Sequence, residues 1–136
     1  MCFEILICLL CMYKIIAMKV LKFEDLIVWQ KSIDLTVLLY RHFEKHQDYS
    51  YSNQIRRAAI SISNNIAEGF DRSTSKDFNR FLYIAKGSCS EVKSMLFLGV
   101  QLGYFSDLEM KQYFIEVDEI GKMLFGLSKS LERKTN

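Results

Sequence analysis

The sequence predicts an all-α protein that folds as an up-down-up-down antiparallel four-helix bundle. The 136 residues include no proline and six glycines, and proline is the residue that most strongly ends or kinks a helix. Half of the residues are apolar and a quarter are charged, which is typical of one folded domain. Four segments repeat apolar side chains at helical spacing. Short connections between successive helices make neighbours antiparallel.

Residues 1–17 differ from the rest of the chain. They hold three of the four cysteines and only two charged residues, Glu4 and Lys14, whereas an amphipathic pattern begins near Met18. The apolar run is too short to cross a bilayer and lacks the basic start of a secretory signal. We therefore assign residues 18–136 to the bundle domain. Residues 1–17 form an N-terminal apolar leader, interpreted first as a wrong start codon, with a partner-binding arm or a targeting segment as alternatives.

The first two predicted helices run from about Asp25 to His46 and from about Ser52 to Glu68. The expected core face of the first helix is Trp29, Ile33, Thr36, Val37, Tyr40 and Phe43. The expected core face of the second is Ile55, Ala58, Ala59, Ile62 and Ile66. Gly69 stands where a helix commonly ends. Because alanine permits close helix contact, we expect the second helix at the centre of the bundle.

The last two predicted helices begin at recognisable caps. The third starts near residues 73–75, where Ser or Thr can cap a helix, and runs to about Leu102, before Gly103. The fourth starts at Ser106, whose spacing from Glu109 fits a capping box. The expected core of the third helix is Phe78, Phe81, Leu82, Ala85, Val92 and Leu96. The expected core of the fourth is Leu108, Tyr113, Phe114, Val117, Ile120, Leu124, Leu127 and Leu131.

The outer side of the third helix carries aromatic and basic residues together. Tyr83 and Phe97 stand away from the core positions, and residues 92–102 are apolar nearly all round, which indicates burial on two sides. Either neighbouring chains cover this side, or bases stack on the rings beside a basic track. The net charge is only +2, so attraction to nucleic acid depends on local clustering. The candidate nucleic-acid-binding residues are Arg56, Lys76, Arg80, Lys86 and Lys93.

The sequence contains no recognisable catalytic, metal or cofactor motif. His42 and His46 are four residues apart, but Glu44 is one place late for a zinc-protease helix, so we expect solvated histidines. Cys8 and Cys11 lack a second pair at zinc-ligand spacing. We therefore predict that the chain is not an enzyme and uses no metal or cofactor. Without a disulfide framework, a cytoplasmic location with no membrane association is expected.

Three sequence blocks resemble the four-helix-bundle proteins encoded by intervening sequences of bacterial 23S rRNA genes. They span residues 23–31, 54–69 and 81–91, within a resemblance that covers about Leu21 to Leu131. The resemblance implies a cytoplasmic bundle that assembles as a ring of five chains. It also implies a relation to accessory proteins of diversity-generating retroelements, which are thought to bind nucleic acid and a reverse transcriptase.

The resemblance also carries over motif residues that either bind a ligand or shape the bundle and the ring: Arg57, Ser61, Asn65, Glu68, Gly69, Gly87, Ser88 and Glu91. Tyr83 and Phe97 join them as candidate interface residues. We expect Arg57 and Glu68 to point away from the core, and Gly87 to permit close helix contact. The predicted function is a non-catalytic homo-oligomer that binds rRNA or other nucleic acid. The alternative is a structural protein-interaction module that binds no nucleic acid.

Overall fold

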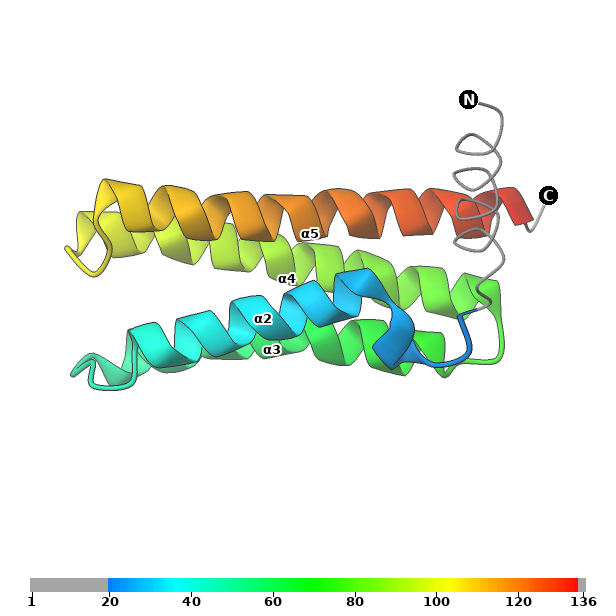
Figure 1. The fold of residues 1–136 in the computed structure, drawn as a ribbon, viewed down its shortest axis with the longest axis horizontal. Coiled ribbons are helices and arrows are strands. Elements are labelled where there is room, and N and C mark those ends of the chain that lie inside the picture. The colour runs from blue at the N-terminus through cyan, green and yellow to red at the C-terminus, as the bar shows by residue number, and fades with distance from the viewer. Residues whose placement is uncertain (1–19, 135–136) are drawn as a thin grey trace, which may run out of the picture.

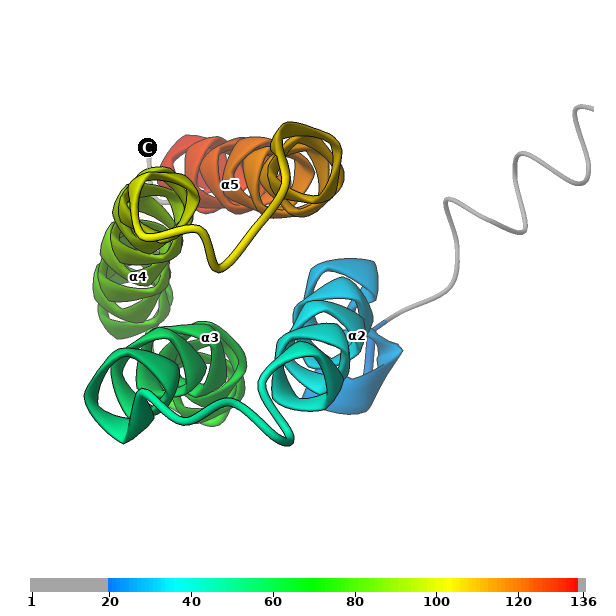
Figure 2. The same cartoon turned by 90° about the vertical axis from the view of Figure 1, so that its left-hand side faces the viewer.

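The computed structural model describes residues 20–134, which form four long antiparallel helices (Figure 1). A short turn, η1 (Phe23–Asp25), precedes α2 (Ile27–His42), α3 (Tyr49–Phe70), α4 (Ser75–Gln101) and α5 (Asp107–Lys134). Viewed along the bundle, the helices surround one core, and α5 returns to pack against α2 (Figure 2). The predicted all-α, up-down-up-down bundle is confirmed.

The leader predicted at residues 1–17 lies outside the described residues. Within residues 20–134, no helix combines the length and the apolar character needed to span a bilayer.

Three of these helices begin at a side-chain cap. Asp48 caps α3 and Thr74 caps α4, and each side chain accepts a hydrogen bond from the backbone N–H three residues on. At α5, Ser106 Oγ accepts from Glu109 N–H (3.1 Å) while Ser106 N–H donates to Glu109 Oε2 (2.8 Å). These bonds satisfy N–H groups that have no partner within the helix. The predicted capping box is therefore confirmed. Gly103, with φ of +76°, follows the end of α4.

The inner faces of α3 and α4 follow the prediction, whereas α5 departs from it at its start. The isoleucines and alanines expected on the core face of α3 are all at most 2% exposed. On α4, Phe81 is half-buried and the other five predicted core residues are buried. Leu108, predicted in the core of α5, is 68% exposed. It lies nine residues before the buried Val117, so at 100° per residue it faces about 180° away from that core position.

Helix α2 buries a different face from the predicted one. Its buried residues are Val28, Ser32, Leu35 and Leu39, whereas Val37 and Tyr40 of the predicted face are exposed. Of the other predicted residues, Phe43 is buried just after the helix, as expected, and Trp29 is partly buried against the core. Ser32 lies in the middle of the buried face, and its Oγ donates to the carbonyl oxygen of Trp29 (2.6 Å). A serine that bonds within its own helix can be buried without an unsatisfied hydroxyl. The apolar pattern was therefore interrupted on the side that packs inward.

The glycines also correct the prediction. Gly69 is buried inside the last turn of α3, and a Cβ there would lie 2.5 Å from Phe81 Cβ. It allows α4 to approach α3 and is not the residue that follows the helix. Gly87 shows the opposite: a Cβ would meet nothing within 4 Å. The close contact expected at Gly87 is therefore absent within residues 20–134, whereas Gly99, not singled out from the sequence, is tightly enclosed.

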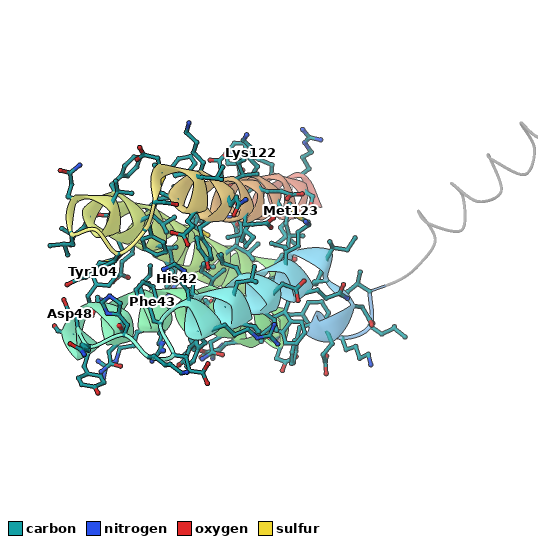
Figure 3. The ribbon with its side chains drawn as sticks, turned by 60° about the vertical axis from the view of Figure 1, so that its left-hand side comes forward. His42, Phe43, Asp48, Tyr104, Lys122 and Met123 are labelled. Atoms are coloured by element: carbon teal, nitrogen blue, oxygen red, sulfur yellow. The ribbon has the colours of Figure 1, made fainter. Side chains whose placement is uncertain are left out.

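The α2–α3 and α4–α5 connections are joined at one end of the bundle (Figure 3). His42 Nε2 lies 2.9 Å from the carbonyl oxygen of Tyr104, so the ring donates through Nε2–H. The His42 ring also stacks on Phe105, with 4.5 Å between ring centroids. Tyr104 Oη donates to Asp48 Oδ2 (2.7 Å), and Asp48 N–H donates to His46 Nδ1 (3.2 Å). Both histidines are thus held by neighbours, which corrects the expectation of solvated side chains. Helix α2 ends at His42, earlier than predicted.

We predict that Asp48→Ala lowers the thermal midpoint at pH 7 by roughly 2–8 °C, because α3 loses its cap and Tyr104 loses its acceptor. The Tyr51 N–H and then the Tyr104 hydroxyl hold the pKa of Asp48 below its ordinary 3.8. A lowered pKa in the folded state means that the stabilisation is present above pH 3.8 and is lost as the pH falls.

Melting curves of wild type and Asp48→Ala, recorded by circular dichroism from pH 7 to pH 3, measure both effects. The difference between the two midpoints should shrink as the carboxyl is protonated. Asp107→Ala is the control, since it removes an exposed acidic residue from the first turn of another helix. Equal midpoints for wild type and Asp48→Ala at pH 7 would show that this junction contributes no stability.

Candidate nucleic-acid interface

The five basic residues predicted to bind nucleic acid do not form one track. Arg56 lies between α2 and α3, where its Nη2 donates to the carbonyl oxygen of Tyr40 (3.2 Å). Its guanidinium carbon is 4.7 Å from the centroid of the Tyr40 ring. The same hollow is lined by Arg41 and by the carboxylate of Glu44. Arg56 is therefore separated from the other four residues, all of which lie on α4.

The four basic residues of α4 divide into free and paired side chains. Lys76, Arg80 and Lys86 are exposed, and none forms an ion pair within residues 20–134. Lys93, by contrast, donates to Asp118 Oδ1 of α5 at 2.6 Å. The first three cations are thus available to an anionic ligand, and Lys93 is already engaged.

Lys86 and Lys93 both face α5, which brings three further lysines to the same side of the bundle. We call this surface the α4–α5 face. It consists of Tyr83, Lys86, Lys93 and Phe97 from α4, with Lys111, Phe114, Asp118, Lys122, Phe125, Lys129 and Glu132 from α5. Five lysines accompany two carboxylates on it, so the local charge is positive although the net charge of the whole chain is only +2.

One carboxylate of the α4–α5 face is shared by two lysines. Asp118 Oδ1 accepts from Lys93 and Asp118 Oδ2 lies 2.9 Å from Lys122 Nζ. The hydrogen bond from Lys93, followed by that from Lys122, lowers the pKa of Asp118 to about 2. Asp118 therefore stays ionised and offsets one of its two cations. The side chain of Lys122 remains 80% exposed, and it projects outward from α5 (Figure 3).

Aromatic rings alternate with these lysines. Phe125 is 48% exposed, and its ring centroid lies 4.9 Å from Lys86 Nζ and 5.5 Å from Lys129 Nζ. Further along, Lys93 Nζ lies 5.0 Å from the centroid of the Phe114 ring, and Phe97 packs edge-on against the same ring. Rings and cations in alternation can contact the bases and the phosphates of one strand.

The second carboxylate, Glu132, connects α4 with the end of α5. Its Oε1 accepts from Tyr83 Oη and from Asn79 Nδ2, both at 3.3 Å, and its Oε2 lies 2.9 Å from Lys129 Nζ. The bond from Lys129 is the main reason that the pKa of Glu132 is lowered. Tyr83 and Lys129 are thus fixed beside each other, whereas Lys86 has no acceptor within the described part of the chain.

Half of the family-motif residues pack α3 against α4. Ser88 Oγ donates to Ser61 Oγ (2.8 Å), and Asn65 Nδ2 donates to the Ser61 carbonyl oxygen (2.7 Å). Gly69 contacts Phe81 from the same side. These small and amide side chains satisfy one another's polar groups where the two helices meet, so their place in the fold is structural.

The remaining motif residues are exposed. Arg57 and Glu68 point away from the core, as expected. Glu68 pairs with Arg72 (2.7 Å), and Glu91 Oε1 accepts from Gln54 Nε2 (2.5 Å). These residues lie along α3 and the adjoining side of α4, and the structure does not bring them onto the α4–α5 face.

The described residues offer little for covalent or metal chemistry. Between residues 20 and 134, no three His, Cys, Asp or Glu side chains gather closely enough to hold a metal ion. Burial raises the pKa of the Cys89 thiol to about 12, so this thiol stays protonated at neutral pH and is a poor nucleophile. What the α4–α5 face can do chemically is bind an anion beside a planar ring.

Comparisons with known proteins agree with the resemblance found in the sequence. Residues 24–126 match the model of a family described as 23S rRNA-intervening sequence protein. Among solved structures, the chain is similar to the crystal structure of a protein of unknown function from the S23 ribosomal protein family of Bacteroides thetaiotaomicron. The two share 26% identity over 76% of this chain and 99% of the other, with a TM-score of 0.71. A comparison with curated proteins finds no match.

Proposed function

This chain belongs to the 23S rRNA-intervening sequence protein family, and from that premise we propose that it is a non-catalytic homo-oligomer that binds RNA or DNA through basic side chains. The observation that carries the proposal is the α4–α5 face, where lysines outnumber carboxylates beside exposed rings. Lysine contacts to phosphates supply affinity that depends little on base sequence and strongly on salt.

Self-association is supported by apolar side chains where α4 ends and α5 begins. Each of them is at least 46% exposed: Phe97, Leu98, Leu102, Leu108 and Ile115. A hollow of about 230 Å³ opens among Phe97, Met110, Lys111, Phe114 and Ile115. An apolar patch of this kind is typical of a surface that another chain covers. The family resemblance suggests a ring of five chains.

The two activities divide the α4–α5 face along its length: Phe97, Lys111 and Phe114 lie in the half that we assign to subunit contact, and Tyr83, Lys86, Phe125 and Lys129 lie in the half left to nucleic acid. The apolar residues lie towards the C-terminal end of α4, whereas Lys76, Arg80 and Lys86 lie in its N-terminal half. A ring sealed through the apolar half leaves the basic half open and repeats it once per chain. The proposed location is the cytoplasm, where reducing conditions suit the free and buried thiol of Cys89.

A protein-interaction module without nucleic-acid binding is the second candidate. It is favoured by exposed apolar side chains on α2, on the far side of the bundle from α4: Ile27, Val37, Leu38 and Tyr40. This surface could receive a protein partner such as a reverse transcriptase. The module becomes the better proposal if the purified oligomer binds no nucleic acid even at low salt.

We predict that reversing two free cations, Arg80→Glu together with Lys86→Glu, weakens nucleic-acid binding at least tenfold. Both side chains are exposed and have no ion pair in the described structure, so the change removes phosphate contacts without breaking the fold. The slope of log affinity against log salt should flatten by roughly 1–2, because fewer counterions are released. Gel-shift titrations against rRNA fragments at several salt concentrations measure both quantities.

The matched control reverses Arg41 at the end of α2 and Lys45 in the turn that follows it, which changes the net charge by the same amount away from α4. Its affinity should stay within about twofold of wild type, and light scattering should show that both variants keep the wild-type size. Equal losses in the two variants would indicate a response to net charge alone, and would count against binding through the free cations of α4.

A further inference from the structure

We propose that the ring of Phe125 is the platform on which an unpaired base stacks, so that the ligand of the α4–α5 face is single-stranded. The inference rests on the proposed function and adds to it the class of nucleic acid and the side chain that selects that class. A base inside a duplex has both faces covered by its neighbours, whereas an unpaired base can stack on an aromatic side chain.

Phe125 is exposed and yet firmly placed. Nearly half of the residue is accessible, although it lies on the side of α5 that adjoins α4. One turn further on, Ser128 is buried and its Oγ donates to Asn79 Oδ1 of α4 (2.5 Å). Asn79 also donates to Glu132. Both bonds hold α5 against α4 within the two turns that follow Phe125. A ring placed by such contacts before the ligand arrives loses less entropy on binding.

The two lysines beside the ring differ in how they are held. Lys129 forms an ion pair with Glu132 (2.9 Å) and stays in place. Lys86 contacts the ring with its ammonium 4.9 Å from the centroid, and it forms no ion pair within residues 20–134. Lys86 can therefore leave the ring and follow a phosphate, while Lys129 remains beside the site.

The relative strengths of the two contacts favour this exchange. An exposed contact between a cation and a ring stabilises by only about two- to fivefold, whereas stacking of one base contributes roughly five- to hundredfold. The departing ammonium also gains a charge-assisted contact with the phosphate of the same nucleotide. A base should therefore displace Lys86 from Phe125.

A second cation–aromatic pair in the molecule lacks these properties. The guanidinium of Arg56 lies 4.7 Å from the centroid of Tyr40, a ring that is 42% exposed. Arg56 also donates a hydrogen bond to the Tyr40 carbonyl oxygen (3.2 Å), which holds it beside the ring, whereas Lys86 has no such bond within residues 20–134. Glu44 lines the same hollow and offsets one of its two cations, Arg41 and Arg56. Tyr40 is thus the natural control for Phe125.

Tyr83 provides a neighbouring ring for the same strand. It is 49% exposed, and its hydroxyl donates to Glu132, the carboxylate that also pairs with Lys129. Lys129 thus contacts Phe125 directly and is linked to Tyr83 through Glu132. One strand crossing from α5 to α4 meets Phe125 first and can then meet Tyr83.

The test uses the full-length oligomer with Phe125→Leu, and with Tyr40→Leu as the matched control. Fluorescence anisotropy would compare labelled oligo(dT), which is unstructured, with a dA·dT duplex of equal length. We expect Phe125→Leu to weaken binding of the single strand roughly five- to hundredfold and to change duplex binding less than about twofold. Tyr40→Leu should change neither. Lys86→Gln should weaken both ligands and flatten the salt dependence.

Three results would overturn the inference, and they point to different errors. If Phe125→Leu binds the single strand as tightly as wild type, Phe125 is not the stacking platform, and the proposed function still stands. If light scattering shows that Phe125→Leu forms a smaller particle than wild type, Phe125 is a contact between subunits. A wild type that binds neither ligand at low salt overturns the proposed function together with the inference.

Discussion

Phe97→Glu should split the proposed homo-oligomer into folded single chains. Phe97 is 55% exposed in the single bundle and lies 5.7 Å from Phe114, centroid to centroid, in a T-shaped arrangement. Covering a side chain of this size contributes about 1.5–3 kcal/mol per contact, and a carboxylate buried there costs several kcal/mol more. The affinity between subunits should therefore fall at least about a hundredfold. The chain itself should stay folded, because the substituted position is open to water and adjoins Lys111.

Light scattering coupled to gel filtration at micromolar concentration measures the change. Leu38→Glu is the matched control, since Leu38 is 43% exposed and lies on α2. It should leave the particle size unchanged while introducing the same charge. A wild type that is already a single well-folded chain at this concentration, or a Phe97→Glu variant of unaltered size, would place any self-association elsewhere on the surface.

The helices that could be predicted are those whose signals are local. The capping box at Ser106 and Glu109 depends on side chains three residues apart, and it forms as expected. The core face of α3 was equally predictable, because its isoleucines and alanines share one side. For α2 the sequence was ambiguous, since apolar residues occur all round it. Ser32 interrupts the apolar pattern on the face that is buried. Its hydroxyl can be buried because it donates a hydrogen bond within the helix, and residue type alone does not reveal that bond.

The candidate site was less predictable, because it depends on two helices meeting. The cations of α4 were visible in the sequence, but their partners were not. Lys122 and Lys129 are seven residues apart and flank Phe125, which is a detectable period. Only the packing of α5 on α4 shows that this group faces Lys86 and that Arg56 stands elsewhere. Only the tertiary structure shows that Lys93 is paired with Asp118, whereas Lys86 forms no ion pair within residues 20–134.

The packing around glycines is the feature that the sequence predicted least well, and it leads to the second large effect that we expect. Gly99→Ala should destabilise the bundle by about 1–3 kcal/mol, after a gain in helix propensity of about 1 kcal/mol is subtracted. A Cβ there would lie 2.3 Å from Tyr51 Oη and 2.5 Å from the Phe105 ring. Both side chains are at most 5% exposed, and Tyr51 Oη donates to the carbonyl oxygen of Met95. Overpacking of this kind costs about 1–3 kcal/mol, and a displaced hydroxyl adds about 1.

Gly87→Ala is the matched control on the same helix. A Cβ at Gly87 meets nothing within 4 Å, so the gain in helix propensity, about 1 kcal/mol, should appear as stabilisation. Urea denaturation of the two variants measures whether the free energy of unfolding falls for Gly99→Ala and rises for Gly87→Ala. A destabilised Gly87→Ala would reveal that another chain packs closely on α4 at this point. An unchanged Gly99→Ala would mean that the Tyr51 and Phe105 side chains move aside at no cost.

A double variant tests whether the clash at Gly99 is the cause of its effect. Tyr51→Phe alone removes the hydrogen bond to Met95 and should cost about 1 kcal/mol. In the Gly99→Ala background the same change also removes the oxygen atom that the new methyl group would strike. The two losses should therefore be less than additive, because the variants share one contact. Strict additivity in urea denaturation would mean that Gly99→Ala acts through the Phe105 ring alone, since that ring is present in both backgrounds.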